Sequence, residues 1–174
     1  MGACHNKGSA TYVTKGRNVS KNENTEPAMP ELEGTQKQID WANDLRKTYV
    51  LEFENAENAE KIQGRSAQTG EIYYNPMTNE RKEKLEAINE LKTATVDILT
   101  DINQASEIID LRNSITSSAI GKAANTIVKN KQALNKLTKE QRGKAVHNIA
   151  AMSLFGTMLF DKKIKTYSRE EMGL

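Results

Sequence analysis

The chain has 174 residues, of which 37% are hydrophobic, 5% are aromatic and 28% are charged, and its formal net charge is +2. This length favours one domain with an additional tail, and the scarcity of aromatic residues and of alternating β-branched runs argues against a sheet-rich fold. The single cysteine excludes an intramolecular disulfide, as is typical of a reducing cytoplasm, and no uncharged apolar stretch is long enough to span a membrane.

The charge is distributed unevenly along the chain. Residues 1–21 carry four basic residues and no acidic one, residues 22–110 have a net charge of −10, and residues 111–174 have a net charge of +8. Residues 31–110 are called the acidic part below, and residues 111–174 the basic part. The asymmetry indicates an ionic partner or charge complementarity between the two parts, and two solvated helix faces that offset each other are the simpler alternative.

Residues 1–30 have the composition of a disordered tail. Glycine, proline and polar residues dominate, and the few apolar residues cannot offset the entropy of ordering the chain. Cys4 and His5 are two adjacent potential metal ligands, which do not make a zinc site. We therefore expect a single folded domain over residues 31–174.

The first helix is expected over residues 36–60. Thr35 is the predicted N-cap, and Gln38 follows three residues later, as a capping box requires. Trp41, the only tryptophan, is expected to anchor the core, with an interface hot spot as the alternative. Arg46 lies about 140° further around the helix, so it does not share a face with Trp41.

The helical pattern then breaks and resumes. Two glycines and an Asn-Pro pair interrupt it, and a short hairpin near residues 62–75 and a loop fit this segment equally well. Thr78 or Asn79 is the expected cap of the next helix. Its apolar spacing continues to Arg112, with a kink near residues 100–101.

Two further helices are expected in the basic part. One covers residues 114–136, and the other begins at a second capping box, Thr138 with Gln141, and continues to Phe160. Four or five helices with short connections predict an all-α bundle. A homo-oligomer, in which the last helix packs against a copy of itself, stays open as a structural alternative.

The basic part contains candidate residues for binding a partner or phosphate. Lys122, Lys129 and Lys136 recur every seven residues and therefore line one face of the predicted helix. The positive surface continues through Lys131, Lys139, Arg142 and Lys144. Phosphate binding requires such a stripe, although no aromatic residues interleave with it, which argues against stacking on single-stranded bases. A solvated helix face is the alternative.

The residues that carry catalysis are scarce. The only histidines are His5 and His147, and the sequence contains no P-loop, no dinucleotide-binding glycine motif and no H-E-x-x-H zinc motif. His147 lies within an apolar helical pattern, which favours a core-edge or partner-facing position over a catalytic one. We therefore expect a protein that is not an enzyme and has no cofactor or metal. A carboxylate nuclease with Mg²⁺ is the least implausible enzymatic alternative.

The segment Gly34–Arg46 carries a resemblance to a known group of proteins. It matches the motif G-[ST]-x-K-Q-I-x-W-A-x-x-[IL]-R through Gly34, Thr35, Lys37, Gln38, Ile39, Trp41, Ala42, Leu45 and Arg46. This motif resembles one found in small proteins of bacterial phages, plasmids and their Gram-positive hosts. The later segment 105–112 is similar to a second element, A-S-W-W-I-D-x-R, with Glu107 and Ile108 in place of the tryptophans.

The resemblance implies an origin in a mobile genetic element, whose accessory genes often act against host defence. We therefore expect a non-enzymatic accessory protein in the cytoplasm of a bacterial host. It would bind and inhibit a host defence nuclease or ribonucleoprotein, for example a CRISPR effector. The alternative is a nucleic-acid-binding module that uses the basic helical face.

Overall fold

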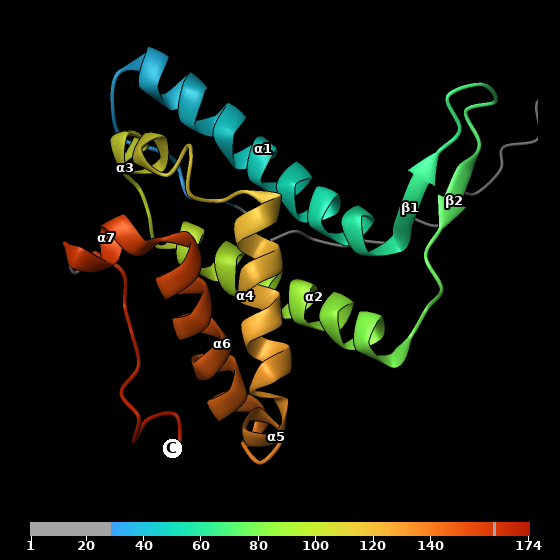
Figure 1. Ribbon diagram of the computed structural model, residues 1–174. Coiled ribbons are helices and arrows are strands. Elements are labelled where there is room, and N and C mark those ends of the chain that lie inside the picture. The colour runs from blue at the N-terminus through green and yellow to red at the C-terminus, as the bar shows by residue number, and fades with distance from the viewer. Residues whose placement is uncertain (1–28, 162) are drawn as a thin grey trace, which may run out of the picture.

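The computed structural model describes residues 29–161 and 163–174 (Figure 1). The expected tail therefore lies almost wholly outside the described residues, as do Cys4 and His5. The elements are α1 (Gln36–Lys61), β1 (Ile62–Arg65), β2 (Ile72–Tyr74), α2 (Asn79–Thr100), α3 (Ala105–Asp110), α4 (Ser117–Lys129), α5 (Lys131–Leu134), α6 (Lys139–Leu154) and α7 (Gly156–Phe160). The described chain is mostly helical, as predicted, but it has seven helices in place of four or five.

Helix α1 begins at the predicted capping box. The backbone N–H of Thr35 donates to Oε1 of Gln38 at 3.0 Å, and the backbone N–H of Gln38 donates to Oγ1 of Thr35 at 3.4 Å. Buried side chains follow at helical spacing, Tyr49 and Phe53 among them. The hydroxyl of Tyr49 donates to the carbonyl of Ile108 at 3.0 Å, which joins the buried face of α1 to α3.

A hairpin occupies the segment near residues 62–75, where the sequence left a hairpin and a loop open. β1 and β2 pair antiparallel, with Tyr73 opposite Gly64 and a bulge between Ile62 and Gly64. The turn includes Gly70 at a φ of +72°, a conformation that favours glycine. Figure 1 shows the hairpin projecting beyond the C-terminal end of α1, away from α6.

The long helix predicted after the hairpin is divided in two. α2 ends at Thr100, α3 begins at Ala105, and the segment before α1 holds the connection between them. The N–H of Glu33 donates to the carbonyl of Asn103 at 2.7 Å, and the N–H of Ala105 donates to the carbonyl of Glu33 at 2.9 Å. These bonds occupy backbone groups that a continuous helix would pair internally, so the expected kink is a complete break.

The two helices predicted in the basic part also end early. α4 stops before Asn130, whose side chain donates to the carbonyl of Thr126 at 2.8 Å, and the short helix α5 follows separately. α6 begins at the predicted Thr138 capping box. It ends at Leu154, and the next residue, Phe155, leaves helical geometry with φ −125° and ψ 24° and is fully buried, at 0% exposed.

The core joins the acidic part to the basic part. α2 packs on α1, α4 and α6, and α4 also packs on α1 and α6 (Figure 1). The largest fully buried side chains are Phe155, Ile88, Leu91, Ile98, Ile108, Leu111, Ile115, Ile120, Leu154 and Thr95. Within the part of the chain that the structure describes, no helix is both long enough and apolar enough to cross a membrane.

Candidate interaction surfaces

Four of the predicted basic site residues are exposed and have no carboxylate within ion-pair distance among residues 29–161 and 163–174: Lys122, Lys129, Lys136 and Lys139. The predicted single helix face is divided, because α4 ends at Lys129 while Lys136 lies in the connection after α5. Lys139 is the first residue of α6. The unpaired lysines are therefore spread over three segments of the basic part.

The other three predicted basic residues are paired with acids. Lys131 Nζ lies 2.7 Å from Oε1 of Glu83, and Lys144 Nζ lies 2.8 Å from Oε1 of Glu140. The third pair joins Arg142 to Glu90 at 2.9 Å. Two of the three acids, Glu83 and Glu90, belong to α2. Ion pairs between the acidic and basic parts therefore neutralise some of the basic residues that were predicted to bind a partner.

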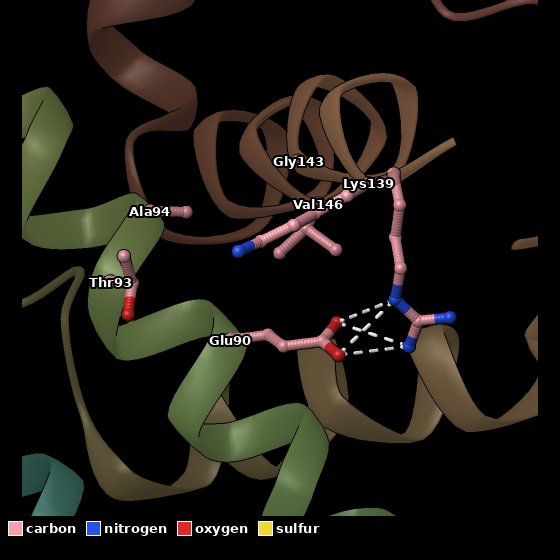
Figure 2. A pocket seen from close by; sticks show the side chains of 7 residues that line it. Glu90, Thr93, Ala94, Lys139, Gly143 and Val146 are labelled. Atoms are coloured by element: carbon pink, nitrogen blue, oxygen red, sulfur yellow. Dashed lines mark hydrogen bonds and ion pairs between the residues drawn. The ribbon is translucent and has the colours of Figure 1, made fainter. Parts of the chain in front are cut away.

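The Arg142–Glu90 pair borders a groove between α2 and α6 (Figure 2). Arg142 donates to the Glu90 carboxylate through Nε and Nη2, and its Nη1 donates to Oδ1 of Asn135 at 2.8 Å. The groove has a volume of about 270 Å³ and mostly apolar walls, and its lining residues are Glu90, Thr93, Ala94, Lys139, Arg142, Gly143 and Val146. Two of the predicted site residues, Lys139 and Arg142, therefore come together at one hollow.

Trp41 is half exposed, at 50%, so the prediction that it anchors the core is wrong. The buried residues of α1 include Ala42, Arg46 and Tyr49, which share one side of the helix. Trp41 precedes Ala42 by one residue and is therefore turned about 100° away from that side. The alternative of an interface hot spot stays open for this side chain.

Arg46 of the motif is buried, at 8% exposed. Its Nη1 donates to the carbonyl of Pro30 at 3.0 Å and its Nη2 donates to the carbonyl of Ile102 at 3.2 Å, while Nε has no partner among the described residues. Burial lowers the pKa of the guanidinium. Arg46 therefore ties the segment before α1 to the connection between α2 and α3, which gives it a structural position.

A set of exposed apolar side chains escaped the sequence analysis. Trp41 and Leu51 lie on α1, Tyr73 and Tyr74 on β2, and Met77 just after the hairpin, each between 49% and 67% exposed. We call these five residues the α1–hairpin surface; they are spread from near the N-terminal end of α1 to the hairpin beyond its C-terminal end (Figure 1). All five residues belong to the acidic part. The sequence allowed a hairpin near residues 62–75, and because a lone two-stranded hairpin has no second layer to cover it, exposed tyrosines could have been predicted from that hairpin.

His147 is half-buried against the C-terminal segment. Its Nε2 lies 2.9 Å from the carbonyl oxygen of Lys165, and its ring meets the ring of Tyr167 edge-on, with centroids 5.2 Å apart. The neighbouring Asn148 donates to the carbonyl of Tyr167 at 2.7 Å and accepts from its N–H at 2.9 Å. This position agrees with the core-edge interpretation of His147.

Within the described ranges, no three His, Cys, Asp or Glu side chains gather closely enough to hold a metal ion. In comparisons with known proteins, no family model matches the chain, and neither a curated protein nor a solved structure matches it significantly. The resemblance carried by residues 34–46 therefore stays a prediction.

Proposed function

We propose that this protein is a non-enzymatic accessory protein of a mobile genetic element, with a helical bundle as its scaffold. It acts in the cytoplasm of a bacterial host, where it binds and inhibits a defence nuclease or ribonucleoprotein such as a CRISPR effector. The observation that supports binding to a protein is the α1–hairpin surface. Tryptophan and tyrosine are enriched among the residues that dominate binding energy at protein interfaces.

The charge around this surface favours a basic partner. Asp40 precedes Trp41, Glu54 follows Leu51 by one turn, and Glu71 precedes β2, and all three carboxylates are exposed. Two exposed cations, Lys37 and Arg65, lie near them, so the balance of these charges is negative by one. A groove that binds nucleic acid is positively charged, because it must neutralise phosphates. An acidic surface with apolar anchors is therefore complementary to the nucleic-acid channel of a nuclease and can compete with its substrate.

The test is a cleavage assay with purified defence nucleases, CRISPR effectors included, and the protein at stoichiometric excess. We expect the wild type to suppress cleavage and the double variant Trp41→Ala/Tyr74→Ala to lose suppression. Met152→Ala is the matched control, because Met152 is 71% exposed but lies on α6 in the basic part. Cleavage that proceeds unchanged with the wild type across a broad nuclease panel would contradict the proposal.

A second candidate function is binding of nucleic acid, which the four unpaired lysines of the basic part favour. Replacing Lys122, Lys129, Lys136 and Lys139 with glutamate would then abolish binding to duplex DNA or RNA. The slope of log K against log salt for the wild type would be about −0.9 for each phosphate contacted. Lys82→Glu is the control, because this lysine is exposed on α2 outside the basic part. Binding retained after the fourfold change would exclude this function.

A further inference from the structure

Gly143 is a glycine in the interior of α6 that the packing of the described chain does not require. A glycine inside a helix is less favourable than alanine. Such a glycine is usually required because neighbouring atoms approach too closely for a Cβ or because the backbone is left-handed. Neither applies here, because a Cβ added at Gly143 would meet nothing within 4 Å and its φ is not in the left-handed region. The missing side chain leaves space free, and that space is part of the groove between α2 and α6.

The size and walls of this groove fit one bulky apolar side chain. Ala94 on α2 and Gly143 on α6 are small, and Val146 on α6 provides an apolar wall of the groove (Figure 2). A volume of about 270 Å³ lies below the roughly 300–1,000 Å³ of pockets that enclose a drug-sized ligand. The groove therefore suits an anchor residue of a protein chain better than a free cofactor.

The rim of the groove carries one positive charge that is available to a partner. Arg142 is already engaged by Glu90 and Asn135. Lys139 is exposed and has no carboxylate within ion-pair distance in the part of the chain that the structure describes. The complementary occupant is therefore an apolar side chain with a carboxylate beside it.

Two other occupants fit this chemistry poorly. The groove disfavours nucleic acid because its walls are mostly apolar and its described lining offers one unpaired cation, Lys139, whereas binding a phosphate backbone requires several. The chain's own residues 1–28 contain four basic and two acidic residues, and their net positive charge is unfavourable beside the unpaired Lys139.

We infer that the groove between α2 and α6 is a docking site for an extended segment of a partner protein. The segment inserts a leucine or an aromatic side chain beside Gly143 and places an adjacent Asp or Glu at Lys139. This site is separate from the α1–hairpin surface, so its failure would leave the proposed inhibitor function untouched. It shares only Lys139 with the four unpaired lysines of the second candidate function.

The experiment is a selection from a displayed random peptide library on the wild-type protein, with counter-selection on Gly143→Leu. We expect the enriched peptides to combine an apolar anchor with a neighbouring acidic residue. The enriched consensus is then synthesised with a fluorescent label, and its binding is measured by anisotropy. Gly143→Leu fills the groove and is expected to weaken binding about tenfold or more, since one buried apolar contact is lost. Lys139→Glu is expected to weaken it about threefold or more through charge repulsion.

The chain offers a matched control in Gly121→Leu. Gly121 is a glycine inside α4 that also has nothing within 4 Å of an added Cβ, but it does not line the groove. Leucine is a better helix former than glycine, so both leucine variants are expected to keep or raise the unfolding temperature. We expect Gly121→Leu to bind the peptide like the wild type.

Three results would overturn the inference. The first is a wild-type selection that enriches no acidic and apolar peptides. The second is equal peptide affinity in the wild type and in Gly143→Leu. The third is a dimer, detected by light scattering, that Gly143→Leu abolishes, because a second copy of the chain would then occupy the groove.

Discussion

The guanidinium of Arg142 holds the carboxylate of Glu90 through two nitrogen atoms, with Nη2 2.9 Å and Nε 3.2 Å from Oε1. The contact joins α6 of the basic part to α2 of the acidic part. The Arg142 side chain is about three-quarters removed from solvent, at 26% exposed, and the Glu90 side chain about two-thirds, at 35% exposed. The pair is therefore better placed than an ordinary surface ion pair to contribute to stability.

We predict a coupling free energy of about 1 kcal/mol between Glu90 and Arg142, near the upper end for pairs that are not fully buried. The measurement is a double-mutant cycle of Glu90→Gln and Arg142→Met in urea unfolding. Lys47 and Asp44 are a comparison pair at 3.0 Å, whose side chains are 76% and 74% exposed. Their cycle is expected to give only about 0.3 kcal/mol. Equal coupling in the two cycles would contradict the prediction.

Arg46→Met is predicted to destabilise the fold by about 2–4 kcal/mol, because it removes two charged hydrogen bonds and leaves their acceptors unpaired. The acceptors are the carbonyls of Pro30 and Ile102, which belong to segments far apart in sequence. Urea unfolding measures the loss. Arg65→Met is the matched control, since Arg65 is exposed on β1, and we expect a change within about 0.5 kcal/mol. A similarly small change for Arg46→Met would show that its hydrogen bonds are dispensable.

The helix starts were predictable from the sequence because their cause is local. The Thr35 and Thr138 capping boxes each involve residues only three positions apart, and both form as predicted. The break between α2 and α3 has a distant cause, because Glu33 supplies the backbone partners of Asn103 and Ala105. No local pattern contains that contact, so the helical spacing was extended through the break.

The candidate sites were predictable only in part for a similar reason. The sequence indicated charge complementarity between the acidic and basic parts, but the pairing of Lys131 with Glu83 depends on the fold that brings Lys131 of α5 within reach of Glu83 of α2. Trp41 was assigned to the core because of its residue type. Only one side of α1 is buried, and Ala42 lies on that side. Trp41, one residue earlier, is turned away from it, so its position around the helix determines its exposure more than its residue type does.

Lys144 sets the ionisation of Glu140, because its hydrogen bond and its charge lower the pKa of that carboxyl. A carboxyl with a lowered pKa in the folded state contributes stability above its unfolded pKa and loses it as pH falls through the folded pKa. We therefore predict that Lys144→Met raises the Glu140 titration midpoint in a ¹³C NMR titration towards its ordinary value. Lys136→Met, which removes a lysine without a described carboxylate partner, should leave the midpoint unchanged. Indistinguishable midpoints in Lys144→Met and the wild type would refute the pairing in solution.

Trp41→Ala is predicted to lower the free energy of unfolding by about 1–2 kcal/mol, because half of this side chain is exposed and contributes no burial. Phe53→Ala, on the buried side of the same helix, is expected to cost about 3–5 kcal/mol.

Trp41 is the only tryptophan, so its fluorescence reports on this position alone. The native protein should emit at the long wavelengths typical of hydrated indole and be quenched readily by acrylamide. When a partner covers the α1–hairpin surface, the emission should shift to shorter wavelengths and quenching should fall. Blue-shifted, protected emission from the free protein would place Trp41 in the core after all and remove it from the proposed interface.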